Sequence, residues 1–269
     1  LEAFTASVKE NLPRANSEAF IKPSAEDRAT FQKAMAQLLG GNLTAAAKSA
    51  AAVNYDLVQL KDLTNRQTYW ILRERAANFR GLGTYVVDPV YRRNLVIHVT
   101  HPIFDLHTLE QGTAVFRETG ARALFISGTH RCANTEAAPC DGTSSVCGKP
   151  SQAYKISDVA HYTENFFQEA HRATLNLRSK PVAVSLHGNV QKSLPDFTLS
   201  DGTEIKSSDE TPVNRLLREL KNRKASAGSC NSAADTGLSL CGTTNAQGRL
   251  SNGAADACKA EAVRSSGLF

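Results

Sequence analysis

Four short apolar segments follow one another between residues 55 and 99. They are "YDLVQLKD" (55–62), "TYWILRE" (68–74), "GTYVVD" (83–88) and "NLVIHV" (94–99). Each has the length of a strand, and turn residues such as Thr64-Asn65 and Asp88-Pro89 separate them. We expect four consecutive strands, of which the first three form an antiparallel meander.

The hydrophobic period becomes helical after residue 107, where Leu109, Thr113 and Phe116 share one predicted helix face. Further along the chain we expect a strand at 121–127, a helix at about 162–177 and a strand at 181–188. Alternating strands and helices predict right-handed crossovers and parallel pairing. The expected fold class is therefore α/β, with a mixed, mainly parallel central sheet and flanking helices.

Helical patterns also appear near both ends of the chain. Ser24 can cap a helix that Gly40-Gly41 ends, and an alanine-rich helix over 43–51 completes a helical hairpin. Residues 1–23 show no clear period, so we expect an extended lead-in. These features predict two parts of the chain. Residues 1–52 form an N-terminal extended segment and helical hairpin, and residues 53–269 form an α/β catalytic-type domain with cysteine-rich loops. A later helix is expected to start at Thr211-Pro212.

Composition places the chain among ordinary globular proteins. It has 269 residues, 41% of them hydrophobic, and a net charge of +5. The basic residues are spread along the chain, which argues against a nucleic-acid partner. No window approaches the roughly 20 apolar residues of a membrane helix, so no membrane span is expected. The first residues, "LEAFTASVKE", contain neither methionine nor a signal sequence, which suggests a mature or trimmed chain.

Six cysteines fall in two groups of three within loop-like sequence, Cys132, Cys140 and Cys147 and then Cys230, Cys241 and Cys258. An even count in such surroundings favours disulfides and a secreted or periplasmic location. Full pairing would need at least one bridge between the two groups. A cysteine zinc site is the alternative, although no Cys-x-x-Cys is present and the gaps are irregular.

Polar residues collect where three predicted strands end: "VTHPIFD", "ISGTHR" and "SLHGN". Ligands of open α/β sheets bind at such strand ends. His101, Asp105 and His187 form a two-histidine, one-carboxylate set suited to zinc, with one coordination position open for catalysis. His98 is mid-strand and is expected to be packed, and His107 is expected to flank the next helix.

Other polar residues are candidates for a substrate site. Arg131, with His130 beside it, suits a substrate carboxylate, although a loop arginine can equally pair with an acid. Asp158 and His161 precede a predicted helix. Asp158 either caps that helix or, like His161, lies behind a metal ligand as a hydrogen-bond partner that fixes a histidine tautomer.

The segment "GTTNAQGRLSNG" (242–253) contains no apolar face. It predicts either a substrate loop with Asn245 and Arg249 facing the pocket or a disulfide-pinned surface loop.

"VTHPIFD" followed by "VAVSLHGN" resembles the metallocarboxypeptidase-like zinc hydrolases, a group that includes poly-γ-glutamate hydrolases and acyl-amino-acid deacylases. The resemblance covers about residues 84–190. It implies that His101 and Asp105 supply the first ligand pair, His187 the third ligand, and Arg131 the substrate or transition-state arginine. The family's first motif is His-x-x-Glu, whereas an aspartate stands here four residues after the histidine. No residue matches the family's catalytic glutamate, so the general base stays unassigned.

The leading interpretation is an exported zinc-dependent hydrolase that cleaves an amide bond by metal-activated water. The resemblance implies that the substrate is a peptide, a cell-wall peptide or a γ-glutamyl polymer. The alternative is a secreted binding protein that keeps the pocket without turnover. Serine hydrolysis by Ser185 has little support, since Gly-x-Ser-x-Gly is absent. A histidine phosphatase would need an arginine next to the histidine of "SLHGN", and none stands there, so this class also has little support.

Overall fold

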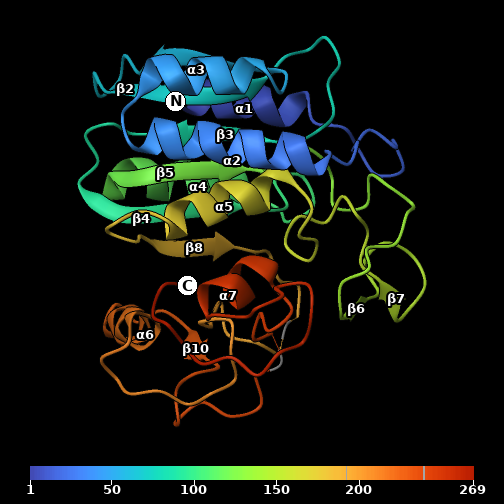
Figure 1. Cartoon of the computed structure of the whole chain (residues 1–269). Coiled ribbons are helices and arrows are strands. Elements are labelled where there is room, and N and C mark those ends of the chain that lie inside the picture. Colours follow the sequence, from blue (N-terminus) through green and yellow to red (C-terminus); the bar gives the residue numbers. More distant parts are fainter. Residues whose placement is uncertain (192, 239) are drawn as a thin grey trace. The chain divides into compact units, whose positions relative to one another are not determined.

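The computed structural model describes every residue of the chain except 192 and 239. It divides the chain into two compact units, residues 1–188 and 189–269 (Figure 1). This division differs from the expected boundary after residue 52. The reason is packing, because α2 (Ala25–Leu39) lies against α5 (Phe166–Leu175), and α3 (Leu43–Ala51) lies against the first strand of the sheet.

The first unit is built on one six-stranded sheet in the order β1-β2-β3-β5-β4-β8. Its strands are β1 (Tyr55–Lys61), β2 (Thr68–Glu74), β3 (Thr84–Val87), β4 (Arg93–Val99), β5 (Ala121–Ile126) and β8 (Val182–Leu186). The predicted meander is confirmed, since β1, β2 and β3 pair antiparallel. The expectation of a mainly parallel sheet is wrong. The meander joins β5 through an antiparallel β3–β5 pair, so only β4–β5 and β4–β8 are parallel.

One face of the sheet carries α4 (Thr108–Thr119), and α1 (Glu2–Glu10) packs on that helix. The extended lead-in expected for residues 1–23 is therefore wrong in its first part. Phe4 and Val8 are one helical turn apart and pack against the core around Phe116 and Leu124. The helix forms because this apolar pair is buried by tertiary contacts rather than through a long periodic pattern.

The other face is covered by α2, α3 and α5 over a cluster of aromatic rings. Phe31 of α2 stacks on Phe166 of α5 with ring centroids 4.1 Å apart and also contacts Tyr55 and Tyr85. The predicted start of α2 is confirmed. The Ser24 side chain accepts a hydrogen bond from the Asp27 amide, and the Asp27 carboxylate accepts one in return from the Ser24 amide.

A long loop connects β5 to α5. It contains a hairpin whose two strands have two residues each, β6 (Thr143–Ser144) and β7 (Gln152–Ala153). A disulfide between Cys132 and Cys147 closes part of this loop. All six cysteines of the chain are disulfide-bonded, which confirms the expectation of disulfides. Such bonding is typical of exported proteins.

The second unit has fewer regular elements: β9 (Phe197–Leu199), α6 (Pro212–Asn222), β10 (Ala227–Ser229) and α7 (Ala246–Ser251). The predicted helix after Thr211 is confirmed as α6, and a Cys230–Cys241 disulfide lies in the same unit. The Thr211 hydroxyl donates to the Ser208 carbonyl instead of capping the helix. None of the helices described is long and apolar enough to cross a bilayer.

Candidate metal centre

His101 lies two residues beyond the end of β4, and its imidazole is buried between two carboxylates. Its Nδ1 atom is 3.0 Å from Oδ2 of Asp105, and its Nε2 atom is 2.9 Å from Oδ1 of Asp158. Asp105 reaches Nδ1 because the chain turns tightly after β4, where the Asp105 amide donates to the His101 carbonyl. A spacing of four residues thus suffices for an aspartate to contact this histidine.

His187 reaches the same carboxylate from the neighbouring parallel strand. β4 pairs with β8 in a register that places Val99 beside Leu186, so both strands deliver their next residues to one edge of the sheet. Nδ1 of His187 lies 3.3 Å from Oδ2 of Asp105, and the His187 side chain is 37% exposed. The structure therefore brings together the three predicted metal ligands, whose donor atoms all lie within 4.8 Å of one another.

These three side chains could hold a metal ion. Two imidazole nitrogens and one carboxylate oxygen form a donor set that zinc commonly takes in catalytic sites. Neighbouring ligands of a tetrahedral zinc lie about 3.3 Å apart, given bond lengths of about 2.0 Å. The separations of 3.0 and 3.3 Å between the histidine nitrogens and the Asp105 oxygen are close to this value.

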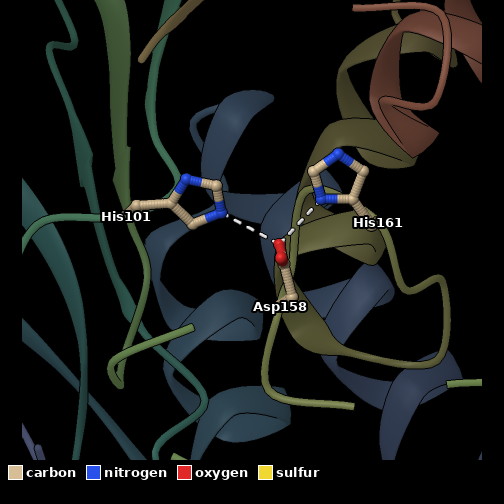
Figure 2. Close-up of side chains that lie close together, drawn as sticks. All are labelled: His101, Asp158 and His161. Carbon is tan, nitrogen blue, oxygen red and sulfur yellow. Dashed lines mark hydrogen bonds and ion pairs between the residues drawn. The ribbon is translucent and has the colours of Figure 1, made fainter. Parts of the chain in front are cut away.

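A second group shares His101 and lies on its other side (Figure 2). Oδ1 of Asp158 is 2.9 Å from Nε2 of His101 and 3.0 Å from Nδ1 of His161. Arg131 donates two hydrogen bonds to Oδ2 of Asp158, of 2.9 and 2.6 Å. The predicted alternative that Asp158 caps the next helix is wrong, because Asn165 caps α5. His101, Asp158 and His161 could also hold a metal ion.

The charges around His101 are closely paired. Burial alone would raise the pKa of Asp158, but His161, Arg131 and His101 hold it well below its usual range. Burial likewise works to lower the pKa of His101, and Arg131 adds to this effect. The carboxylates of Asp158 and Asp105 outweigh burial and Arg131, so the pKa of His101 is raised. A metal ion at Nδ1 would therefore replace a proton that Asp105 stabilises.

The predicted substrate residues lie in different surroundings. Arg131 is buried against Asp158, and its guanidinium carbon lies 5.4 Å from the ring centroid of Phe104. His130 is partly exposed and lies edge-on to the same ring. In the second unit, the Asn245 side chain caps α7, and Nε of Arg249 donates to the Thr243 carbonyl. Substrate binding by these four residues stays a prediction.

Two hydroxyls lie beside His187; Ser185 was considered in the sequence only as a serine nucleophile, and Thr100 was not singled out. Nε2 of His187 lies 3.0 Å from Oγ of Ser185 and 3.4 Å from Oγ1 of Thr100. The spacing of two residues between Ser185 and His187 is a usable signal, because alternate strand residues share one face. Tyr154 stacks on His161 at 3.8 Å, and nothing in its loop sequence indicates this.

The two histidines set aside in the sequence lie where they were expected. His98 is buried and stacks on Phe125, and His107 occupies the N-cap position of α4. Comparisons with protein-family models, curated proteins and solved structures found no match. The resemblance to metallocarboxypeptidase-like hydrolases therefore stays a prediction from the residues alone.

Proposed function

We propose that the chain is an exported zinc-dependent hydrolase that cleaves an amide bond. The observation that carries this proposal is the meeting of His101, Asp105 and His187 at the end of two parallel strands, with His187 partly exposed. Zinc, when bound, polarises a carbonyl group and makes a water molecule more acidic. The substrate class, a peptide, cell-wall peptide or γ-glutamyl amide, follows from the family resemblance.

The group around Asp158 supports the ligands in this proposal. A metal-binding histidine usually donates its second N–H to a carboxylate, which fixes the tautomer and the ring plane. Asp158 stands in that place, because its Oδ1 faces Nε2 of His101 and leaves Nδ1 for the metal. Arg131 and His161 compensate the buried carboxylate and keep it ionised.

We call His101, Asp105 and His187 the outer group, and His101, Asp158 and His161 the inner group. The exposure of their side chains favours metal binding at the outer group. His101, Asp158 and His161 have side chains that are 0, 1 and 14% exposed, so their group is closed. A catalytic zinc needs a coordination position that water and substrate can reach. The outer group offers this through His187.

Metal content of three variants tests the assignment. Elemental analysis should find about one zinc per wild-type chain, and His101→Ala and His187→Ala should lose it. His161→Ala is the matched control and should keep zinc, because its histidine contacts Asp158 rather than the metal. If His161→Ala lost zinc and His187→Ala kept it, the metal would belong to the inner group of His101, Asp158 and His161. A wild-type chain that takes up no supplied zinc would favour the binding-protein alternative.

One observation favours a second candidate, acyl transfer by Ser185. Oγ of Ser185, His187 and Asp105 form a chain of contacts of 3.0 and 3.3 Å, which is the order of groups in a serine hydrolase. The Ser185 oxygen would attack the carbonyl carbon and pass its proton to Nε2 of His187. The His187 ring would then return this proton to the leaving group, and water would hydrolyse the acyl-serine ester.

The two candidates exclude each other, because both use Nδ1 of His187 and the Asp105 carboxylate. A chelator that stops turnover, with no labelling of Ser185 by a fluorophosphonate, would support the zinc hydrolase. Labelling that Ser185→Ala removes and a chelator leaves unchanged would support the serine hydrolase.

A further inference from the structure

His130 lies in the loop after β5, beside the candidate metal centre. Its ring is edge-on to Phe104, with centroids 5.4 Å apart, and Phe104 directly precedes the predicted ligand Asp105. Arg131 packs over the same phenyl ring. Phe104 therefore places the imidazole of His130 next to the turn that carries Asp105.

The tautomer of His130 follows from one backbone contact. The Cys132 amide donates a hydrogen bond of 3.0 Å to Nδ1 of His130. A backbone amide is only a donor, so Nδ1 carries no proton, and the neutral ring has its proton on Nε2. At His101, by contrast, each ring nitrogen faces a carboxylate that can accept a hydrogen bond.

The backbone around His130 is held on both sides. Its amide donates to the Pro13 carbonyl, and its carbonyl accepts from the Ala133 amide. Cys132 is fixed in turn by its disulfide to Cys147. The ring is therefore positioned by the fold before any ligand arrives, which is the condition for efficient hydrogen bonding in catalysis.

The surroundings of His130 also favour its neutral form. Burial lowers its pKa, and the nearby positive charges of His101, Arg131 and Arg14 lower it further. Among the residues that the structure describes, none accepts a hydrogen bond from Nε2. The His130 side chain is partly exposed.

We propose that Nε2–H of His130 donates a hydrogen bond to the carbonyl oxygen of the substrate amide and stabilises the oxyanion that forms there. This inference rests on the proposed function and adds a catalytic residue to it. Removing one such donor typically lowers kcat by about 10²–10³-fold.

Binding of a phosphinic peptide tests this role without turnover. Such a peptide carries a tetrahedral oxyanion in place of the scissile amide. Calorimetry should show about 100-fold weaker binding to zinc-loaded His130→Ala, with zinc content unchanged. His130→Gln should restore part of the affinity, because its amide N–H can reach a similar position. His107→Asn, a change at an exposed histidine, should bind like the wild type.

Turnover adds a second readout. With an amide substrate, His130→Ala should lower kcat by about 100-fold and change KM much less, since the hydrogen bond strengthens as negative charge develops. A variant that merely misfolds would lose zinc as well. Long-range nitrogen NMR should show a protonated Nε2 and an unprotonated Nδ1 for His130.

Three results would overturn the inference. The first is a wild-type affinity of His130→Ala for the phosphinic peptide, and the second is a proton on Nδ1. Either of these leaves the zinc hydrolase intact if wild-type protein binds zinc and turns over an amide. A wild-type protein that binds neither zinc nor the peptide would overturn the proposed function and this role together.

Discussion

The two units of the chain are stabilised by different kinds of contact. In residues 1–188, a six-stranded sheet lies between helices, and large rings such as Phe31, Tyr85 and Phe116 are fully buried. In residues 189–269, the only strand pair among the described residues has three residues on each side. That unit depends on a disulfide and on buried polar groups such as Asn231. Apolar burial tolerates small shifts of its neighbours, whereas a hydrogen bond requires a specific partner at a specific distance.

The largest effect is expected from the aromatic core of the first unit. Phe31→Ala should lower the free energy of unfolding by about 4 kcal/mol, because it leaves a cavity among Phe166, Tyr55 and Tyr85. Denaturant unfolding followed by circular dichroism measures this loss. Leu63→Ala, at a side chain 89% exposed, serves as the control and should change little. A loss below about 1 kcal/mol at Phe31 would contradict the account of this core.

The disulfide of the second unit comes next. Cys230 and Cys241 are 11 residues apart, and replacing both by serine should cost about 3 kcal/mol through the entropy of the unfolded loop. Hydrogen exchange followed by mass spectrometry should show faster exchange in peptides from 197–251. Peptides from β4 and β5 should keep wild-type protection. Equal loss of protection in both units would show that they unfold together and would remove the contrast drawn between them.

Asn231 tests the polar network of the second unit. Its Nδ2 group contacts Asp201, Thr203 and Ile205, and its Oδ1 accepts from the Asp201 amide. Asn231→Ala should destabilise the unit by about 2 kcal/mol, because several buried polar atoms lose their partner. Calorimetry of this variant beside Asn222→Ala, at an exposed helix end, measures the difference. Similar unfolding of the two variants would argue against the network.

His98 should make the first unit sensitive to acid. Burial, followed by the nearby charges of His171 and His187, holds the pKa of His98 well below 6.5. Below pH 6.5 the unfolded chain therefore binds a proton that the folded chain does not, so this group lowers stability as the pH falls. The contribution is at most about 1.4 kcal/mol per pH unit.

His98→Phe should reduce this dependence, since both His98 nitrogens are buried without a partner among the described residues. Unfolding free energies at pH 5 and pH 7, compared between wild type and variant, measure the effect. An unchanged difference between the two pH values would show that other groups cause the acid sensitivity.

Much of the first unit could be predicted from its sequence. The strands β1 to β5 and the helices α2 and α4 are marked by apolar period, turn residues and caps such as Ser24 and Gly120. The pairing was harder to predict. Which strand joins β3 depends on contacts between distant residues, and β5 takes that place although β4 is next in sequence. α1 was missed because only Phe4 and Val8 mark its buried face.

The candidate site was predictable where strand ends deliver side chains to a common edge. His101, Asp105 and His187 follow from that rule, and the structure places them together. The ion pair of Arg131 with Asp158 was not singled out, since 27 residues separate the two and the loop between them has no regular pattern. In the second unit, the network around Asn231 was missed for the same reason. Hydrogen-bond partners in irregular segments leave no periodic mark in a sequence.

The parallel register of β4 and β8 has a consequence for how the gene can change. Successive strand residues point to opposite faces, so one codon inserted within 182–184 would turn Ser185 and His187 away from Asp105 together. A codon inserted in the connection between α5 and β8 would leave the pairing of the strands intact. Length variation among descendants of this gene should therefore accumulate in that connection and avoid the strand itself.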